Sequence, residues 1–362
     1  MKSLCLTMIV RNEAHVIRRC LESVRPYITT WCICDTGSTD GTQDIIRSAL
    51  DGIIGELHER PWVDQQHNRN EAMELARKRA DFLLLIDADE QFVPDPGFLM
   101  PSLHHDCYDL IVSMEPGDCE FPRCIFVDSR YPWQWRGKRH PGLYGEGAQN
   151  PILMTGCKII SRADGQSWRD PAKYEQHVRD MEAAVADDPD NPRTLYYLAQ
   201  SQRDAGMLQD ALATYERVAA DTSWSERTWS ALYEAAKLRE RLAQPLRDVI
   251  AGYLAAFCQR PSRAEPLYQA ARYLRERGLP QVGLVFAQEA AAIPKPSGER
   301  MFVEPSIYRW RCLDEIVRCA FFAGELLPAL DAMPKLIEAA PASEAARFAR
   351  NALALGRVRD SY

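Results

Sequence analysis

The chain has 362 residues, a formal net charge of −7, 46% hydrophobic residues and 26% charged residues. This length suffices for two domains with separate cores, and the composition is ordinary for a globular protein. The net negative charge argues against general binding of nucleic acid. No apolar run approaches the roughly 20 residues that cross a bilayer, and the eleven scattered cysteines predict a cytoplasmic location rather than a disulfide framework.

Short apolar runs separated by Gly, Pro and Asp predict alternating strands and helices in the first part of the chain. Strands are expected over 4–10, 31–35, 52–59, 81–87, 108–114 and 124–128, and helices over 13–24, 40–50 and 68–80. Asn12 is the expected N-cap of the first helix. This alternation predicts an α/β domain with a mainly parallel sheet over residues 1–165.

The loop after the second strand, DTGSTDGT, begins with Asp35. Its glycines permit tight backbone, and Ser38, Thr39 and Asp40 are candidates to cap the following helix. In an open α/β sheet, ligands bind outside the carboxyl ends of the strands. Asp35 is therefore expected to face a pocket, where its carboxylate can accept hydrogen bonds from a nucleobase or ribose. The alternative is a turn and helix cap without a ligand.

A second polar pair, Asp87 and Asp89, follows the buried run FLLLI. By the two-residue period of a strand, both carboxylates are expected on one strand face, pointing into one cavity. Two neighbouring carboxylates repel each other unless a hard divalent cation lies between them and a diphosphate. Helix caps and turns also contain Asp-x-Asp, so the pair alone is weak evidence for a cation site. The buried strand that precedes it makes such a site a stronger prediction.

The segment 128–147, DSRYPWQWRGKRHPGLYGEG, interleaves aromatic residues with Arg130, Arg136, Lys138 and Arg139. Aromatic faces suit sugars or bases, and cations suit phosphates. The alternative is a loop whose aromatic residues seal the domain edge. Its many Gly and Pro residues predict an irregular lid.

Glu146, between two glycines, is the candidate general base of that segment. The alternative for it is a solvated loop carboxylate.

After about residue 170 the strands give way to helices rich in Ala, Leu and Arg. LYYLAQSQRDAGMLQDALATYERV has the packing residues of a tetratricopeptide repeat, and Trp229 follows Leu195 by 34 residues, the length of that repeat. Gly278 and Gly324 are expected at later inter-helix turns. We therefore predict an all-α, tetratricopeptide-like domain over 166–362. The apolar end FARNALALGRV predicts a homo-oligomer or partner contact through the repeats, and unrelated amphipathic helices are the alternative.

The motifs MIVRNEAHVIRRCLESV, DTGSTDGTQDII, RNEAMELARKRADFLLLIDADE and YPWQWRGKRH together resemble family 2 glycosyltransferases with the GT-A fold. With the helical repeats, the chain is similar to the cysteine S-glycosyltransferases of glycopeptide bacteriocins. The resemblance implies transfer of a sugar from a nucleotide-diphosphate sugar, such as a UDP-sugar. It covers nearly the whole chain and specifies neither sugar nor acceptor.

The resemblance also implies roles for individual residues. Arg11 and Glu13 would form part of the base pocket, Asp35 would contact uracil or ribose, and Arg69 would hold the nucleotide sugar. Asp87 would contact ribose or metal, and Asp89 would bind Mn²⁺ or Mg²⁺. The family often has a His-Glu pair after a Trp-Gly element.

Here Trp135, Gly137 and His140 are present, but Pro141 replaces the Glu. Trp135 is therefore expected at the nucleotide sugar. His140 is a candidate catalytic residue together with Glu146 and a candidate third metal ligand, with a plain surface or core histidine as the alternative. The general base stays open.

These features predict an inverting, metal-dependent glycosyltransferase in which a carboxylate deprotonates the acceptor. The acceptor is a peptide or protein side chain, with a glycan or a modified nucleobase as alternatives. Nucleotidyl transfer is disfavoured because a Gly-rich phosphate loop with Lys is absent near the first strand. A non-catalytic repeat protein with a decayed first domain is the remaining alternative, and the intact Asp35, Asp87 and Asp89 argue against it.

Overall fold

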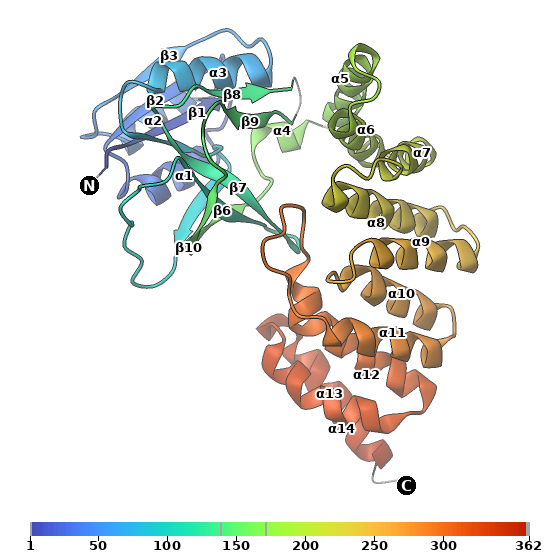
Figure 1. The fold of residues 1–362 in the computed structure, drawn as a ribbon. Helices are drawn as coiled ribbons and strands as arrows, with labels where there is room; N and C mark the ends of the chain where they lie inside the picture. The colour runs from blue at the N-terminus through green and yellow to red at the C-terminus, as the bar shows by residue number, and fades with distance from the viewer. Residues whose placement is uncertain (1, 138–139, 171, 360–362) are drawn as a thin grey trace. The chain divides into compact units, whose positions relative to one another are not determined.

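The computed structural model of the protein describes residues 2–137, 140–170 and 172–359, with side chains of the last helix up to residue 352. Lys138 and Arg139 of the predicted basic loop, and the side chains of the second half of FARNALALGRV, lie outside this range. The chain forms two compact units, Met1–Ala205 and Gly206–Tyr362. Figure 1 shows that strands and helices make up the first part of the chain and that, within the described range, only helices follow α4.

The first unit is built around an eight-stranded sheet of order β3-β2-β1-β4-β7-β6-β10-β5. Four of its strand pairs are parallel (β1/β2, β2/β3, β1/β4, β6/β10) and three are antiparallel (β4/β7, β6/β7, β5/β10). The strands are β1 Leu4–Val10, β2 Thr30–Asp35, β3 Gly55–Glu59, β4 Phe82–Leu85, β5 Glu90–Pro94, β6 Cys107–Met114, β7 Cys119–Asp128 and β10 Ile152–Ser161. The α/β prediction with a mainly parallel sheet is confirmed, although β5 and β10 were not predicted.

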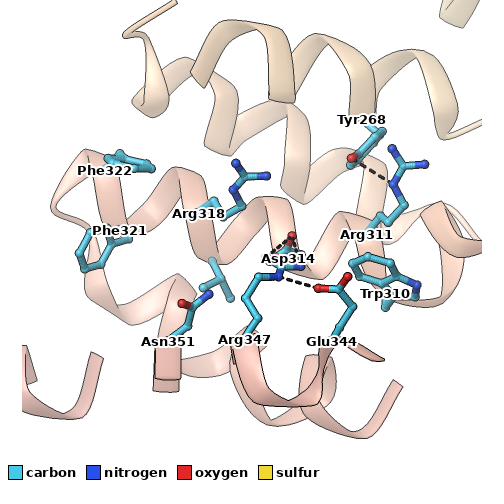
Figure 2. Close-up of a pocket in the computed structure, with 11 residues that line it drawn as sticks. Tyr268, Trp310, Arg311, Asp314, Arg318, Phe321, Phe322, Glu344, Arg347 and Asn351 are labelled. Carbon is cyan, nitrogen blue, oxygen red and sulfur yellow. Dashed lines mark hydrogen bonds and ion pairs between the residues drawn. The ribbon is translucent and has the colours of Figure 1, made fainter. Parts of the chain in front are cut away.

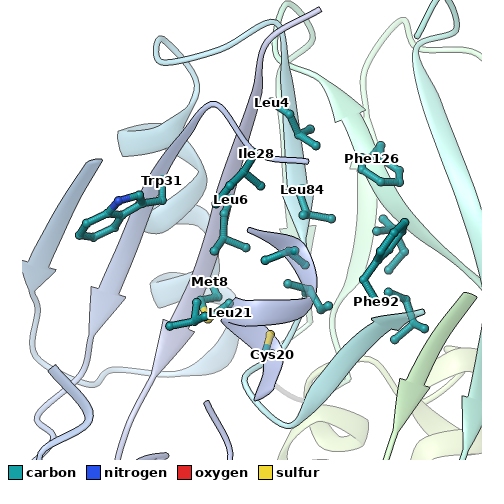
Figure 3. Close-up of a cluster of buried hydrophobic side chains, with 14 of the residues drawn as sticks. Leu4, Leu6, Met8, Cys20, Leu21, Ile28, Trp31, Leu84, Phe92 and Phe126 are labelled. Carbon is teal, nitrogen blue, oxygen red and sulfur yellow. The ribbon is translucent and has the colours of Figure 1, made fainter. Parts of the chain in front are cut away.

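The central strands are buried on both faces because their two side-chain sets pack on different helices. On one face, Leu4 and Leu6 of β1 pack with Cys20 and Leu21 of α1 (Ile17–Val24), in the cluster of Figure 3. On the other face, Cys5 lies in a cluster with Met73 and Ala76 of α3 (Gln65–Ala76). Two further helices belong to this part of the fold, α2 (Thr42–Ala49) and the short α4 (Gln166–Arg169).

Two local predictions were wrong. The first helix begins at Ile17 rather than residue 13, and Asn12 does not cap it. Asn12 has a positive φ of 56°, and its side-chain oxygen accepts a hydrogen bond from the Thr39 backbone N–H at 2.8 Å. The segment expected to be irregular contains an antiparallel ribbon of β8 (Trp133–Arg136) and β9 (Gly142–Gly145). Aromatic residues on this ribbon stabilise it despite the glycines, since Trp133 is buried against the sheet cluster.

Within each compact unit, the helices that follow the last strand pack against their neighbours in sequence. In the first unit these are α5 Lys173–Asp187 and α6 Pro192–Asp204. In the second unit they are α7 Leu208–Ala219, α8 Ser225–Arg241, α9 Leu246–Gln259, α10 Glu265–Glu276, α11 Pro280–Ala292, α12 Cys312–Ala323, α13 Leu326–Ala339 and α14 Ala345–Arg359. Gly278 and Gly324 lie at the predicted inter-helix turns with φ of 79° and 76°, a conformation that favours glycine. The helical-repeat prediction is confirmed.

The boundary predicted between residues 165 and 166 follows the last strand, which ends at Ser161. The compact units divide later, after Ala205, because α4 to α6 group with the sheet. The change in secondary structure and the division into compact units are thus two different boundaries. None of the helices among the described residues is long and apolar enough to span a bilayer.

Candidate functional site at the strand ends

The candidate site lies at the carboxyl ends of three parallel neighbours, β2, β1 and β4. Val10 pairs with Asp35 and Thr7 pairs with Leu85, so the loops that follow the three strands meet at one sheet edge. These loops contain most of the polar residues singled out in the sequence. The register therefore brings together residues that are up to 76 positions apart, such as Glu13 and Asp89.

Asp35 is fully buried at the end of β2. Its Oδ1 accepts hydrogen bonds of 2.8 Å from the backbone N–H groups of Gly37 and Ser38. Gly37 has a φ of 105°, which a residue with a side chain rarely adopts. The other oxygen, Oδ2, is buried and has no hydrogen-bonding partner among the described residues. A buried carboxylate oxygen without a donor is unfavourable by itself, so this atom fits a ligand that supplies an N–H or O–H group.

The loop after β1 contains Arg11, which is exposed, and Glu13, which is half-buried. Both oxygens of Glu13 accept from the Gln166 N–H, at 3.2 and 3.1 Å. Burial raises the pKa of Glu13 to about 7, opposed by that hydrogen bond and reinforced by the negative charges of Asp89 and Asp87. A carboxyl group with a pKa near neutrality can accept a proton at working pH.

The prediction that Asp87 and Asp89 share a strand face was wrong, because β4 ends at Leu85. Both residues lie in the turn between β4 and β5. Asp87 accepts a 2.7 Å ion-pair hydrogen bond from Arg69, whose guanidinium lies 5.0 Å from the centre of the Trp135 ring. Burial opposes ionisation of Asp87, but the charges of Arg69 and Arg123 lower its pKa overall.

The negative charge of Asp89 has fewer nearby donors and cations than that of Asp87. Its Oδ2 accepts one long hydrogen bond, 3.4 Å, from the Gly165 N–H, and Arg19 holds its backbone carbonyl at 3.1 Å. Burial, followed by the charges of Asp87 and Glu90, raises the pKa of Asp89 to about 6. Excess negative charge at this turn fits a bound cation.

A cavity of about 390 Å³ opens beside this turn, and we call it the strand-edge cavity. It brings together four of the predicted residues, Arg69, Asp87, Trp135 and His140. Arg11, Glu13, Asp35, Asp89 and Glu146 do not line it. The remaining wall comes from Gln65, Leu85, Ile86, Arg123, Cys124, Pro141, Ser167, Trp168, Lys173, Tyr174, His177, Gln200, Ser201 and Asp204.

The wall from α4 to α6 was missed by the sequence analysis. Its only sequence signal is the polar segment SWRDPAKYEQH, and a polar segment of this kind normally indicates a linker between domains. The His140 ring stacks on the Tyr197 ring of α6, with 4.6 Å between the ring centres. The His177 ring of α5 lies edge to face with the His140 ring, with 6.0 Å between their centres. An aromatic wall of this kind suits a sugar ring or an extended chain.

The described residues contain no group of three or more His, Cys, Asp or Glu arranged to hold a metal ion. His140 is thus not placed in a ligand group with Asp87 and Asp89. Mg²⁺ and Mn²⁺ are nevertheless commonly bound by one or two carboxylates plus phosphate oxygens and water. Burial first, and then the neighbouring charges of Asp87 and Glu90, raise the pKa of Asp89. A bound cation would favour the ionised form, so the two aspartates fit it.

A second cavity, of about 660 Å³, lies in the helical unit and is shown in Figure 2. Its charged residues are largely paired with each other. Arg347 contacts Asp314 at 3.0 Å and Glu344 at 2.6 Å, and Arg311 donates to the Tyr268 hydroxyl at 3.2 Å. These pairs join neighbouring helices, since Arg347 of α14 contacts Asp314 of α12.

Comparison with known proteins gives a match of residues 5–164 to the family described as "Glycosyl transferase family 2". Glycosyltransferase SunS of Bacillus phage SPbeta, like its prophage copy in Bacillus subtilis, is 23% identical over 208 residues, covering 53% of this chain and 47% of SunS. A TPR repeat-containing protein of Synechococcus elongatus is 36% identical over 94 residues, covering 26% of this chain and 22% of the relative. The chain thus spans less than half the length of these relatives.

Among solved structures, the crystal structure of MamA protein is similar with a TM-score of 0.38 and 17% identity, covering 49% of this chain and 88% of that one. YrrB, described as a TPR protein with an unusual peptide-binding site, has a TM-score of 0.37 and 14% identity, with coverage of 49% and 84%.

Proposed function

We propose that the protein moves a sugar from a nucleotide-diphosphate sugar to an acceptor, because residues 5–164 match family 2 of the glycosyltransferases. The single observation that supports this best is the unpartnered, buried Oδ2 of Asp35, at the same sheet edge as the turn that contains Asp87 and Asp89. It suits the N–H of a uracil base or the hydroxyl of a ribose. We therefore propose UDP as the nucleotide.

The reaction we propose is a single displacement that inverts the anomeric carbon. The acceptor forms a bond to that carbon while the bond to the diphosphate oxygen breaks and a carboxylate takes the acceptor proton. We propose that Arg69, which contacts Asp87 and the Trp135 ring, holds the nucleotide sugar. Asp87 and Asp89 would hold Mn²⁺ or Mg²⁺, which neutralises charge on the leaving diphosphate when bound.

The test that needs no acceptor is slow hydrolysis of the donor. The protein is incubated with a panel of UDP-sugars and with GDP-mannose, with MnCl₂ or with EDTA, and the released nucleotide is measured. We expect release from at least one UDP-sugar, and stronger release with Mn²⁺. If no sugar is hydrolysed and no nucleoside diphosphate binds in a calorimetric titration, the proposal fails.

For the acceptor we propose a peptide or protein side chain, in line with the sequence resemblance, with a glycan or a modified nucleobase as alternatives. The aromatic residues Trp168, Tyr174 and His177 of the cavity wall are compatible with each of these chemistries. A screen with the active UDP-sugar against peptides, oligosaccharides and single-stranded DNA separates them.

Glu146 is our proposed base, and Glu146→Gln is expected to reduce transfer to acceptor by about 100-fold or more while UDP affinity stays unchanged. Glu146 is exposed in the turn after β9, so the β8–β9 ribbon must move for the carboxylate to reach the acceptor. Single-turnover transfer and UDP titration measure the two effects. Glu74→Gln, the same change on the exposed face of α3, is the control. Full activity of Glu146→Gln would move the base assignment to Glu13.

The helical unit is proposed to bind a second copy of the chain. Phe322 at the end of α12 and Leu327 in α13 are 63% and 81% exposed, which is unusual for large apolar side chains. We expect the double variant Phe322→Ser/Leu327→Ser to shift the protein toward monomer in light scattering, with Ser substitutions at exposed Arg247 and Lys335 as the control. A monomeric wild type would contradict self-association.

A further inference from the structure

Lys173, the first residue of α5, lines the strand-edge cavity but lies beyond the region that matches the family. It is only 9% exposed. Its ammonium lies 3.5 Å from the centre of the Trp168 ring and 4.8 Å from that of Tyr174. The two aromatic faces attract the cation and fix the position of a side chain that is otherwise flexible.

Among the residues that the structure describes, no side chain or backbone carbonyl accepts a hydrogen bond from this ammonium, and no carboxylate lies at ion-pair distance from it. A Lys ammonium has three donors, and burying such a charge without acceptors is unfavourable. Consistent with this, burial lowers the pKa of Lys173, although the more distant Asp204 and Asp89 favour the charged form. Lys173 is thus a nearly buried side chain at the cavity wall, and its ammonium has no acceptor among the described residues.

The other cations of the cavity are already compensated. Arg69 forms its ion pair with Asp87 at 2.7 Å, and Arg123 contacts Glu90 at 2.8 Å. Lys173 therefore differs from both arginines, since its charge is balanced only at longer range. An anionic ligand in the cavity would supply both the missing charge and the missing acceptors.

We propose that Lys173 binds the diphosphate of the nucleotide sugar, so that the first repeat helix completes the donor site. This inference rests on the proposed function. A diphosphate has several charged oxygens, which match the three donors of an ammonium. The cavity of about 390 Å³ has room for this part of a donor. The helical region would then act in donor binding itself, in addition to any role in binding the acceptor.

The test compares UDP with uridine, which lacks phosphate, by titration of the full chain in EDTA and again in MgCl₂. Lys173→Met and Lys173→Gln remove the charge and keep much of the side-chain length. We expect both variants to bind UDP about 10- to 100-fold more weakly and uridine with unchanged affinity. Arg179→Met is the matched control, since Arg179 is an exposed cation of the same helix, paired with Glu175, and does not line the cavity.

Three results would overturn the inference. Unchanged UDP affinity in both variants would show that the ammonium does not contact the diphosphate. An equal loss of UDP and uridine affinity would show that Lys173 only supports the local structure around Trp168. If the wild type binds none of UDP, GDP, CDP, ADP or dTDP, the proposed function fails first, and the role of Lys173 fails with it.

Discussion

Asp89→Asn is expected to lower hydrolysis and transfer of the nucleotide sugar by at least about 100-fold, with the chain still folded. The amide keeps one oxygen that can accept the Gly165 N–H, so the turn should keep its conformation. It lacks the negative charge that a hard cation needs in a ligand. Initial rates at several MnCl₂ concentrations measure the loss, and Asp44→Asn, the same change at an exposed position of α2, is the control.

The same variant has an expected effect on stability, measured without metal. The pKa of Asp89 is raised to about 6 from an ordinary value of 3.8, so between these pH values the folded chain binds a proton that the unfolded chain has released. Stability therefore falls as pH rises through this window. Asp89→Asn has no such titrating group and does not lose this stability. In EDTA at pH 8, the melting temperature of the variant should therefore equal or exceed that of the wild type.

The two readouts together decide the role of Asp89. Lower activity with an unchanged or higher melting temperature supports a ligand to the cation. Lower activity with a lower melting temperature would point to a structural role. Turnover near that of the wild type would overturn the assignment of the metal site to this turn.

Asp35→Asn is expected to weaken binding of uridine and UDP by about 10- to 100-fold. The amide oxygen can replace Oδ1, which accepts from Gly37 and Ser38, so the loop should keep its conformation. The NH₂ group then replaces Oδ2, and it presents donors where the ligand also presents a donor. The loss of ligand affinity comes from this donor–donor contact as well as from the missing hydrogen bond.

Titration of both ligands measures this effect, and uridine is the sharper probe because it lacks the phosphates. Asp40→Asn is the matched control in the same loop, since the Asp40 oxygens are used by Ala14 and Thr42. It should disturb the loop without changing Oδ2 of Asp35, the acceptor that we propose for the ligand. If the two variants lose equal affinity, loop order rather than Asp35 controls binding.

The sequence by itself determined the class of fold and the position of Asp35. Local periodicity is enough to identify a strand buried on both faces or a helix with one apolar face, because each pattern reports its own backbone geometry. Asp35 was placed at the end of its strand because the apolar run stops there, and β2 does end at Asp35. The glycines at the inter-helix turns were found for the same reason, since a left-handed φ is a local requirement.

Only the tertiary structure decided which polar residues share a cavity. The pKa of Asp87 is lowered and that of Asp89 is raised, because Arg69, 18 positions from Asp87, pairs with Asp87. The ribbon of β8 and β9 formed where composition predicted a loop, because Trp133 gains burial against a distant cluster. Lys173 has no local signature. A lysine at a helix start is ordinarily solvated, and Lys173 is nearly buried here because Trp168 of α4 and Tyr174 of α5 lie against its ammonium.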